Sequence, residues 1–147
     1  MKTLNYLFFT LALFMFSGTV NAQDEEMKPK KYDNPEWYYV VYIDYETGKF
    51  QKAMDIVENY YMKATKSANL PGPYMVMEMN SGEYDLMVVW KLKDGLDSMN
   101  WEISPDDIKW RQAFTKLVGD KEKADKIHEE YQSYVRSSMG QLARKKW

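Results

Sequence analysis

The chain has 147 residues, a formal net charge of −2 at pH 7 and no cysteine. This length suits a single domain, and so weak a charge does not indicate nucleic acid or an anionic surface as a partner. The absence of cysteine excludes disulfides, zinc–thiolate sites, iron–sulfur clusters and thiol catalysis.

The first 22 residues have the pattern of a cleaved export signal. Lys2 supplies a positive charge, an apolar run covers residues 7–16, and Val20-Asn21-Ala22 ends the segment with small residues. The run is short for a bilayer span, and an uncleaved membrane anchor is the alternative. We therefore predict a periplasmic or secreted protein with no stable membrane insertion after cleavage. Its mature chain begins near Gln23 and has a net charge of −3, because the signal removes one base and no acid.

The expected mature chain begins with a linker, a strand and a helix. Residues 23–35 are charged and contain two prolines, which is typical of a flexible linker. Residues 36–46 (EWYYVVYIDYE) are rich in aromatic and β-branched residues and predict a strand. Apolar residues then recur at steps of three and four over residues 49–68, which predicts an amphipathic helix with Asn69 as its cap.

Two further strands form an expected hairpin. Residues 74–79 and 84–93 both have strand composition, and the turn between them, residues 80–83, contains asparagine and glycine. Two such runs joined by a short turn predict an antiparallel pair.

Two helices are expected to complete the domain. Ser104, followed by proline and two aspartates, is typical of a helix start, and Gly119 ends that helix. Asp120 caps a last helix whose apolar stripe continues to Ser138. A short final strand near residues 139–143 is an open alternative. The predicted order is β-α-β-β-α-α in one α+β domain over residues 36–147.

Side chains alternate across a strand, so each predicted strand divides into a wholly apolar set and a mixed set. The apolar sets, which the helices are expected to cover, are Trp37, Tyr39, Val41, Ile43 and Tyr45, then Met75, Met77 and Met79, then Tyr84, Leu86, Val88, Trp90 and Leu92. The mixed sets are still too apolar to face water. We therefore expect a second copy of the chain to cover them, giving a homodimer with a pocket between two sheets.

This expected pocket supplies the candidate site. The ligand-binding candidates are Tyr38, Tyr42, Tyr74, Met87 and Lys91, and the candidate catalytic carboxylates are Asp44 and Glu78. Tyrosine rings stack on planar or sugar-like ligands, and an enclosed carboxylate is a common acid or base. The alternative is that these residues only pack and pair at the interface.

The only histidine, His128, lies at the edge of the last helix's apolar stripe, beside two glutamates. No second ligand at metal-binding spacing accompanies it, so we expect no metal site and no cofactor. His128 is interpreted as a boundary residue of the helix, with a general base as the alternative.

The order of elements, with both sheet faces apolar, resembles the dimeric α/β-barrel superfamily over residues 37–139. These ferredoxin-like proteins include stress-responsive barrel proteins and antibiotic-biosynthesis-type monooxygenases, whose sheets pair face to face. The resemblance implies an antiparallel sheet that pairs into a barrel. Two departures are a poorly marked fourth strand and the split of the second helix at Gly119-Asp120.

Three functions remain open from the sequence. The first is an exported, non-enzymatic protein, ligand-binding or stress-associated, that holds an apolar or aromatic small molecule in the dimer lumen. The second is a cofactor-free monooxygenase or isomerase acting on an aromatic small molecule. The third is a protein-interaction module of the cell envelope, whose apolar face binds a different protein.

Overall fold

A computed structural model describes residues 27–147, and the predicted export signal lies outside them. Asp33–Trp147 forms one compact unit. Among the described residues, no helix is long and apolar enough to cross a membrane.

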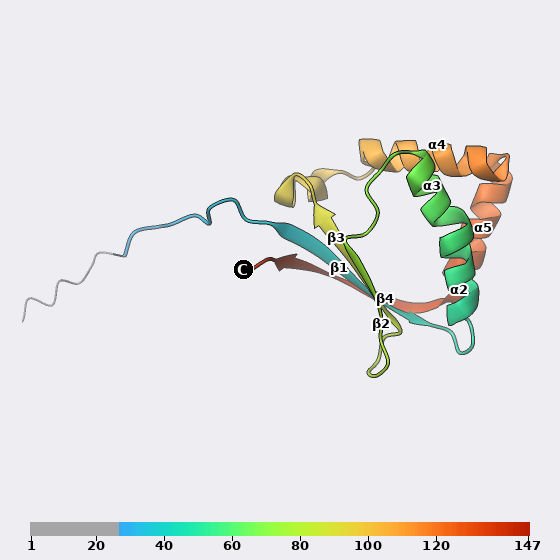
Figure 1. Cartoon of the computed structure of the whole chain (residues 1–147), viewed down its shortest axis with the longest axis horizontal. Coiled ribbons are helices and arrows are strands. Elements are labelled where there is room, and N and C mark those ends of the chain that lie inside the picture. Colours follow the sequence, from blue (N-terminus) through green and yellow to red (C-terminus); the bar gives the residue numbers. More distant parts are fainter. Residues whose placement is uncertain (1–26) are drawn as a thin grey trace, which may run out of the picture. The chain divides into compact units, whose positions relative to one another are not determined.

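The compact unit is an α+β domain with one antiparallel sheet (Figure 1). Its strands are β1 (Trp37–Tyr45), β2 (Met75–Glu78), β3 (Leu86–Leu92) and β4 (Val135–Arg144). Its helical segments are α2 (Phe50–Ile56), the π-helical turn η1 (Val57–Tyr61), α3 (Met62–Ser67), the 3-10 helix η2 (Gly95–Asn100), α4 (Pro105–Val118) and α5 (Lys121–Tyr134). The sheet order is β2-β3-β1-β4, and every neighbouring pair is antiparallel. The predicted ferredoxin-like arrangement is confirmed.

The helix ends follow the local signals in the sequence. The Ser104 hydroxyl accepts a hydrogen bond from the backbone N–H of Asp107, whose carboxylate accepts one from the Ser104 N–H, so a capping box starts α4. Gly119 ends that helix at a φ of 110°, a conformation that favours glycine. The Asp120 carboxylate then accepts from the backbone N–H of Lys123 at the start of α5. Asn69 has a φ of 53° just after α3, as expected of a helix C-terminus.

The prediction that the last helix continues to Ser138 is wrong. It ends at Tyr134, and Val135 and Ser138 belong to a ten-residue strand that pairs with β1 along its length. The physical reason is long-range: pairing satisfies the backbone groups along the edge of β1, and this outweighs a helical pattern in a polar segment. The final strand that the sequence left open near residues 139–143 is therefore present, and it is longer than expected.

Gly140 in β4 makes room for a tyrosine of the neighbouring strand. A Cβ atom at this glycine would lie 1.9 Å from the Tyr39 hydroxyl oxygen and 2.5 Å from the ring carbon that carries it. The Tyr39 ring therefore lies directly over the backbone of Gly140, where no larger residue fits without displacing it.

Two hydrophobic clusters hold the domain together. The first joins one end of the sheet to α2 and α5 through Tyr45, Ala53 and Leu86. The second joins the helices to one another through Ala64, Phe114 and Ala124. Figure 1 shows all the long helices on one side of the sheet, with α2 and α5 meeting it at the end where β1 finishes and β4 begins.

The expectation that the helices cover a whole sheet face holds only at that end. On the helix side, Val76, Trp90 and Leu142 remain 52%, 40% and 49% exposed. The helices bury much of their apolar surface against one another in the second cluster, so they do not extend over the rest of the sheet.

The assignment of the two side-chain sets of β2 is also wrong. Glu78 lies opposite Leu86 in the sheet, so its set points to the helix side. Met75 lies opposite Val89 and Met77 opposite Met87, so the methionines point to the other side. Alternation in a short strand does not say which set meets which face, because a shift of one residue exchanges them.

Candidate functional site

The sheet side away from the helices is called the open face. The register places on it Tyr38, Val40, Tyr42 and Asp44 of β1, Met75 and Met77 of β2, Met87, Val89 and Lys91 of β3, and Ser137, Met139, Gln141 and Ala143 of β4. Strand side chains alternate, so these residues form one continuous surface. It contains five of the predicted ligand-binding and catalytic residues.

Tyrosine pairs and methionines make up most of the apolar surface of the open face. The rings of Tyr38 and Tyr74 lie 5.3 Å apart, and those of Tyr42 and Tyr84 lie 5.5 Å apart. The Tyr84 hydroxyl also reaches the sulfur of Met139 at 3.9 Å. Tyr84 was predicted on the helix side, but it precedes β3 and its ring turns toward Tyr42.

Much of this apolar surface is accessible in the single chain. Tyr74 is 59% exposed, and Met75, Met77 and Met139 are 43%, 46% and 37% exposed. Tyr38, beneath Tyr74, is only 7% exposed, and Val40, Tyr42, Met87 and Val89 on the two central strands are partly buried. Exposed tyrosine and methionine side chains in one patch are typical of interfaces and of adaptable binding surfaces.

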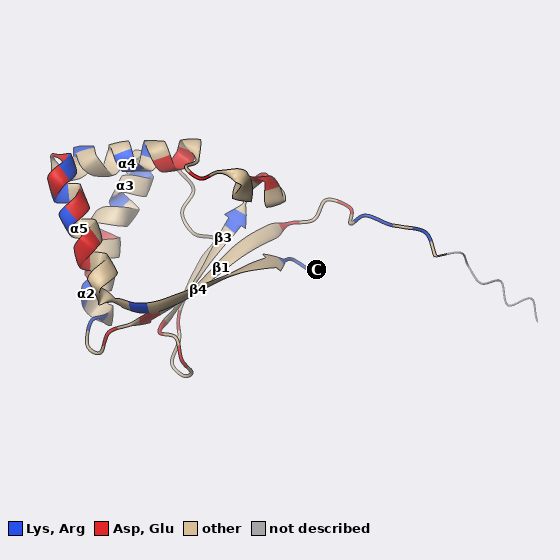
Figure 2. Ribbon diagram, turned by 180° about the vertical axis from the view of Figure 1, so that it is seen from behind, with Lys and Arg blue, Asp and Glu red and all other residues tan. Residues whose placement is uncertain are grey.

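Charged residues lie at the two ends of the open face. At the start of β1, Glu36 pairs with Lys91 and with Lys145, the latter at 3.1 Å. These two lysines lower the pKa of Glu36 to about 2. At the other end, Arg136 lies 3.2 Å from Asp44 and 3.7 Å from Glu46. Figure 2 shows that Lys, Arg, Asp and Glu are concentrated on the helices and in the loops, and the strands are mostly without charge.

The two carboxylates that the sequence offered as alternative candidates for a base lie on opposite faces of the sheet. Asp44 lies on the open face and is held by Arg136, whereas Glu78 lies on the helix side and is exposed to solvent. Lys91, expected near both, pairs with Glu36 instead. Of the sequence candidates, the structure brings together Tyr38, Tyr74 and Lys91 at one end of the face and Tyr42 and Met87 at its centre.

A second group of aromatic residues lies inside the domain, and it was not predicted from the sequence. We call Tyr45, Tyr61 and Tyr131 the tyrosine core. The hydroxyls of Tyr45 and Tyr131 are 2.9 Å apart, and the rings of Tyr61 and Tyr131 pack edge to face at 5.3 Å. The Tyr61 hydroxyl lies 3.2 Å from Nδ1 of His128. The sequence analysis placed each of these residues in the apolar pattern of its own strand or helix. Such a pattern does not show that residues from β1 and two helices meet in the fold.

Burial is the main cause of the electrostatics of the tyrosine core. Desolvation raises the pKa of Tyr45, Tyr61 and Tyr131 above the usual range of tyrosine. These phenols therefore stay protonated at neutral pH, and one of the Tyr45 and Tyr131 hydroxyls donates a hydrogen bond to the other. At the pH of most cells, these hydroxyls therefore contribute packing and hydrogen bonds and do not act as acids or bases.

Within residues 27–147, no three His, Asp or Glu side chains lie close enough together to hold a metal ion. The described chain likewise leaves no buried side-chain nitrogen or oxygen without a hydrogen-bond partner. The strongest chemical feature is therefore the open face itself.

Solved structures support this fold. The chain is similar to a NIPSNAP family protein from Agrobacterium tumefaciens, with a TM-score of 0.53 and 11% identity over 81% of this chain and 93% of that one. A second NIPSNAP family protein of unknown function from the same organism gives 0.52 and 10% identity over 80% of this chain and 94% of that one. No family model and no curated protein matches the sequence. At such low identity, the likeness shows the ferredoxin-like fold alone.

Proposed function

We propose that the open face is the interface of a homodimer, and that the space between the two sheets binds a neutral apolar or aromatic small molecule without catalysis. The observation that carries the proposal is the accessible apolar surface of this face, where Tyr74, Met75, Met77 and Met139 are 37–59% exposed, between two charged ends. The protein would work outside the cytoplasm, as its first 22 residues predict.

The two charged ends favour a second copy of the chain as the occupant. Glu36, Lys91 and Lys145 have a net charge of +1, and the opposite cluster of Asp44, Glu46 and Arg136 has −1. In a two-fold dimer whose sheets face each other with opposed strand directions, each positive end lies over a negative end. Such complementarity sets the orientation of partners and excludes like-charged arrangements.

The side chains at the centre suit an apolar ligand. Tyr42 and Tyr84 offer aromatic surfaces with hydroxyls, and Met77 and Met87 adapt their shape to an irregular guest. Asp44, the candidate base on this face, is held in an ion pair by Arg136, and Glu78 lies on the other side of the sheet, which favours binding over catalysis.

Two neighbouring residues of β2 give a matched pair of variants for the dimer. Met77 is 46% exposed on the open face, and Val76 is 52% exposed on the helix side. We expect light scattering on a sizing column to give twice the protomer mass for residues 23–147 and for Val76→Lys, and the protomer mass for Met77→Lys. A monomeric parent chain, or a dimer that only Val76→Lys breaks, would contradict the proposed interface.

The ligand is tested with N-phenyl-1-naphthylamine, a neutral aromatic probe whose fluorescence rises in apolar surroundings. We expect a fluorescence rise with the dimer and none with the Met77→Lys monomer, and a weaker rise with Tyr42→Ala. An unchanged rise with Met77→Lys would place binding elsewhere and contradict a lumen site.

Export is tested by expressing all 147 residues in a bacterial host and measuring the mass of the product in the periplasm and medium. We expect a chain that begins near Gln23. A full-length product that stays with the membrane would instead support the anchor.

A further inference from the structure

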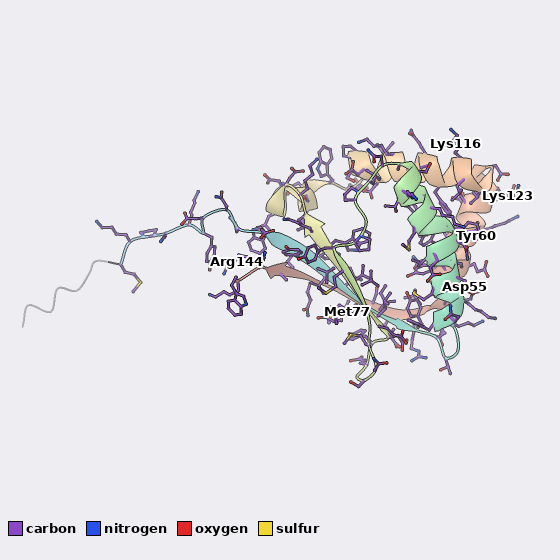
Figure 3. The ribbon with its side chains drawn as sticks, in the orientation of Figure 1. Asp55, Tyr60, Met77, Lys116, Lys123 and Arg144 are labelled. Atoms are coloured by element: carbon purple, nitrogen blue, oxygen red, sulfur yellow. The ribbon has the colours of Figure 1, made fainter. Side chains whose placement is uncertain are left out.

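A groove between α4 and α5 lies apart from the open face. It has a volume of about 600 Å³, and its lining includes Trp110, Phe114, Thr115, Arg111, Lys116 and His128. This volume is within the range of small-molecule sites, although the groove is open on one side. Figure 3 shows Lys116 near the end of α4 that leads into α5.

The aromatic part of the groove is held in place by the helices behind it. The rings of Trp110 and Phe114 stack at 5.1 Å with an angle of 28° between their planes. Trp110 donates a hydrogen bond from its indole nitrogen to the Thr65 hydroxyl at 3.0 Å, and Phe114 is buried in the second cluster. A preorganised flat surface of this kind suits a planar ring, since it loses little conformational freedom on binding.

His128 presents a ring nitrogen to the same groove. The Tyr61 hydroxyl lies 3.2 Å from Nδ1 of His128, and the imidazole tautomer decides which of the two groups donates. In the tautomer that accepts at Nδ1, Nε2 carries the hydrogen and is a donor. Tyr61 occupies Nδ1, so Nε2 is the ring nitrogen left for a ligand in the groove that His128 lines.

The charges of the groove favour an anion. Lys121 pairs with Asp125, which neutralises the one carboxylate of the lining. Arg111 and Lys116 have no ion-pair partner among the described residues. The groove therefore holds two cations outside any ion pair and the polar side chains of Gln112, Thr115 and His128 around an aromatic surface, with no unpaired carboxylate.

We propose that the α4–α5 groove is a second binding site, for a small planar aromatic carboxylate. The ring of the ligand stacks on Trp110, which Phe114 supports from within the domain, and its carboxylate accepts hydrogen bonds from Arg111, Lys116 and His128. The lining residues belong to α4, α5 and the turn between them and none lies on the open face, so the proposed dimer interface forms no part of this groove.

The test is isothermal titration calorimetry with 2-naphthoate as the ligand. The protein is expressed as the full chain and purified from whichever cell fraction of the host contains it. The neutral analogue 2-naphthamide has the same ring without the charge. We expect the Arg111→Gln/Lys116→Gln double variant to weaken 2-naphthoate binding about tenfold or more, since it removes two charge-assisted contacts. The amide should bind about tenfold more weakly than the acid to the parent chain and be little affected by the double variant.

Lys109→Gln is the matched control. Lys109 lies on the same helix, pairs with Asp106 and is outside the groove lining, so its removal should change affinity by less than about twofold. Equal losses in the control and the double variant would overturn the proposal, since they would reflect net charge alone. Failure of the parent chain to bind 2-naphthoate, or binding that Met77→Lys abolishes and the groove variants leave intact, would also overturn it.

Discussion

Tyrosines serve two different surfaces in this domain. In the tyrosine core, Tyr45 is only 2% exposed, and its hydroxyl pairs with that of Tyr131. On the open face, Tyr74 is 59% exposed and packs on one neighbouring ring. Both sets are equally apolar in sequence. One chain thus completes the packing around the first set, whereas the second set stays accessible in the single chain, where the proposed partner would cover it.

The largest expected effect is a difference in stability between two variants, each of which truncates one tyrosine of one set to alanine. Tyr45→Ala removes a ring that packs against Phe50 and Tyr131 and should lower the free energy of unfolding by about 3–5 kcal/mol. Tyr74→Ala should cost less than about 1 kcal/mol in the isolated protomer. Urea unfolding of both variants in the Met77→Lys background measures this. Equal losses would remove the distinction between the two sets.

Tyr39 is an intermediate case, since it packs on a neighbouring backbone rather than on rings. Gly140→Ala introduces a Cβ where the Tyr39 ring lies and should cost about 1–2 kcal/mol in urea unfolding. Because the clash needs that ring, Gly140→Ala should cost much less when Tyr39→Leu is already present. Additive losses in the double variant would show that the ring does not rest on Gly140.

The tyrosine core should also make the protein sensitive to alkali. Its folded pKa values are raised, so above pH 10 the unfolded chain releases protons that the folded chain keeps. Stability is therefore full below about pH 10 and falls as the pH rises further. Tyr61→Phe should flatten this decline in a series of urea titrations, and Tyr74→Phe should leave it unchanged. The reverse order would contradict the assignment of the buried set.

The smallest expected effect belongs to the charged end of the open face. The pKa of Glu36 is lowered from its usual value of 4.5 to about 2 by Lys91 and Lys145. The stability from this cluster is thus present above pH 4.5 and is lost as the pH falls toward 2. Glu36→Gln should remove a small part of the acid dependence of thermal unfolding between these values. Because the pair is exposed, the change should be slight, and a loss as large as that of Tyr45→Ala would contradict this view.

Local signals predicted the fold well where a few neighbouring residues decide the structure. The cap at Ser104, the break at Gly119 and the strand that became β1 follow from such signals. The start of β4 did not, because pairing with β1 forms it.

The candidate site was predicted in part. The tyrosines of β1 fell on the correct face because a long strand alternates reliably. Glu78 and the methionines of β2 did not, since a four-residue strand takes its face from the register with β3. The contact of Tyr61 with His128 joins residues 67 positions apart, which a sequence pattern does not connect.

A second copy of the chain is proposed to cover the open face. Methionine oxidation by dilute hydrogen peroxide, followed by peptide mass spectrometry, tests it residue by residue. Met75 and Met77 are 43% and 46% exposed on this face, and Met62 on α3 is 58% exposed away from it. We expect Met75 and Met77 to oxidise more slowly as protein concentration rises, while the rate at Met62 stays constant. If all three oxidise at rates independent of concentration, and Met75 and Met77 are as reactive as Met62, the open face is bare in solution and the account is wrong.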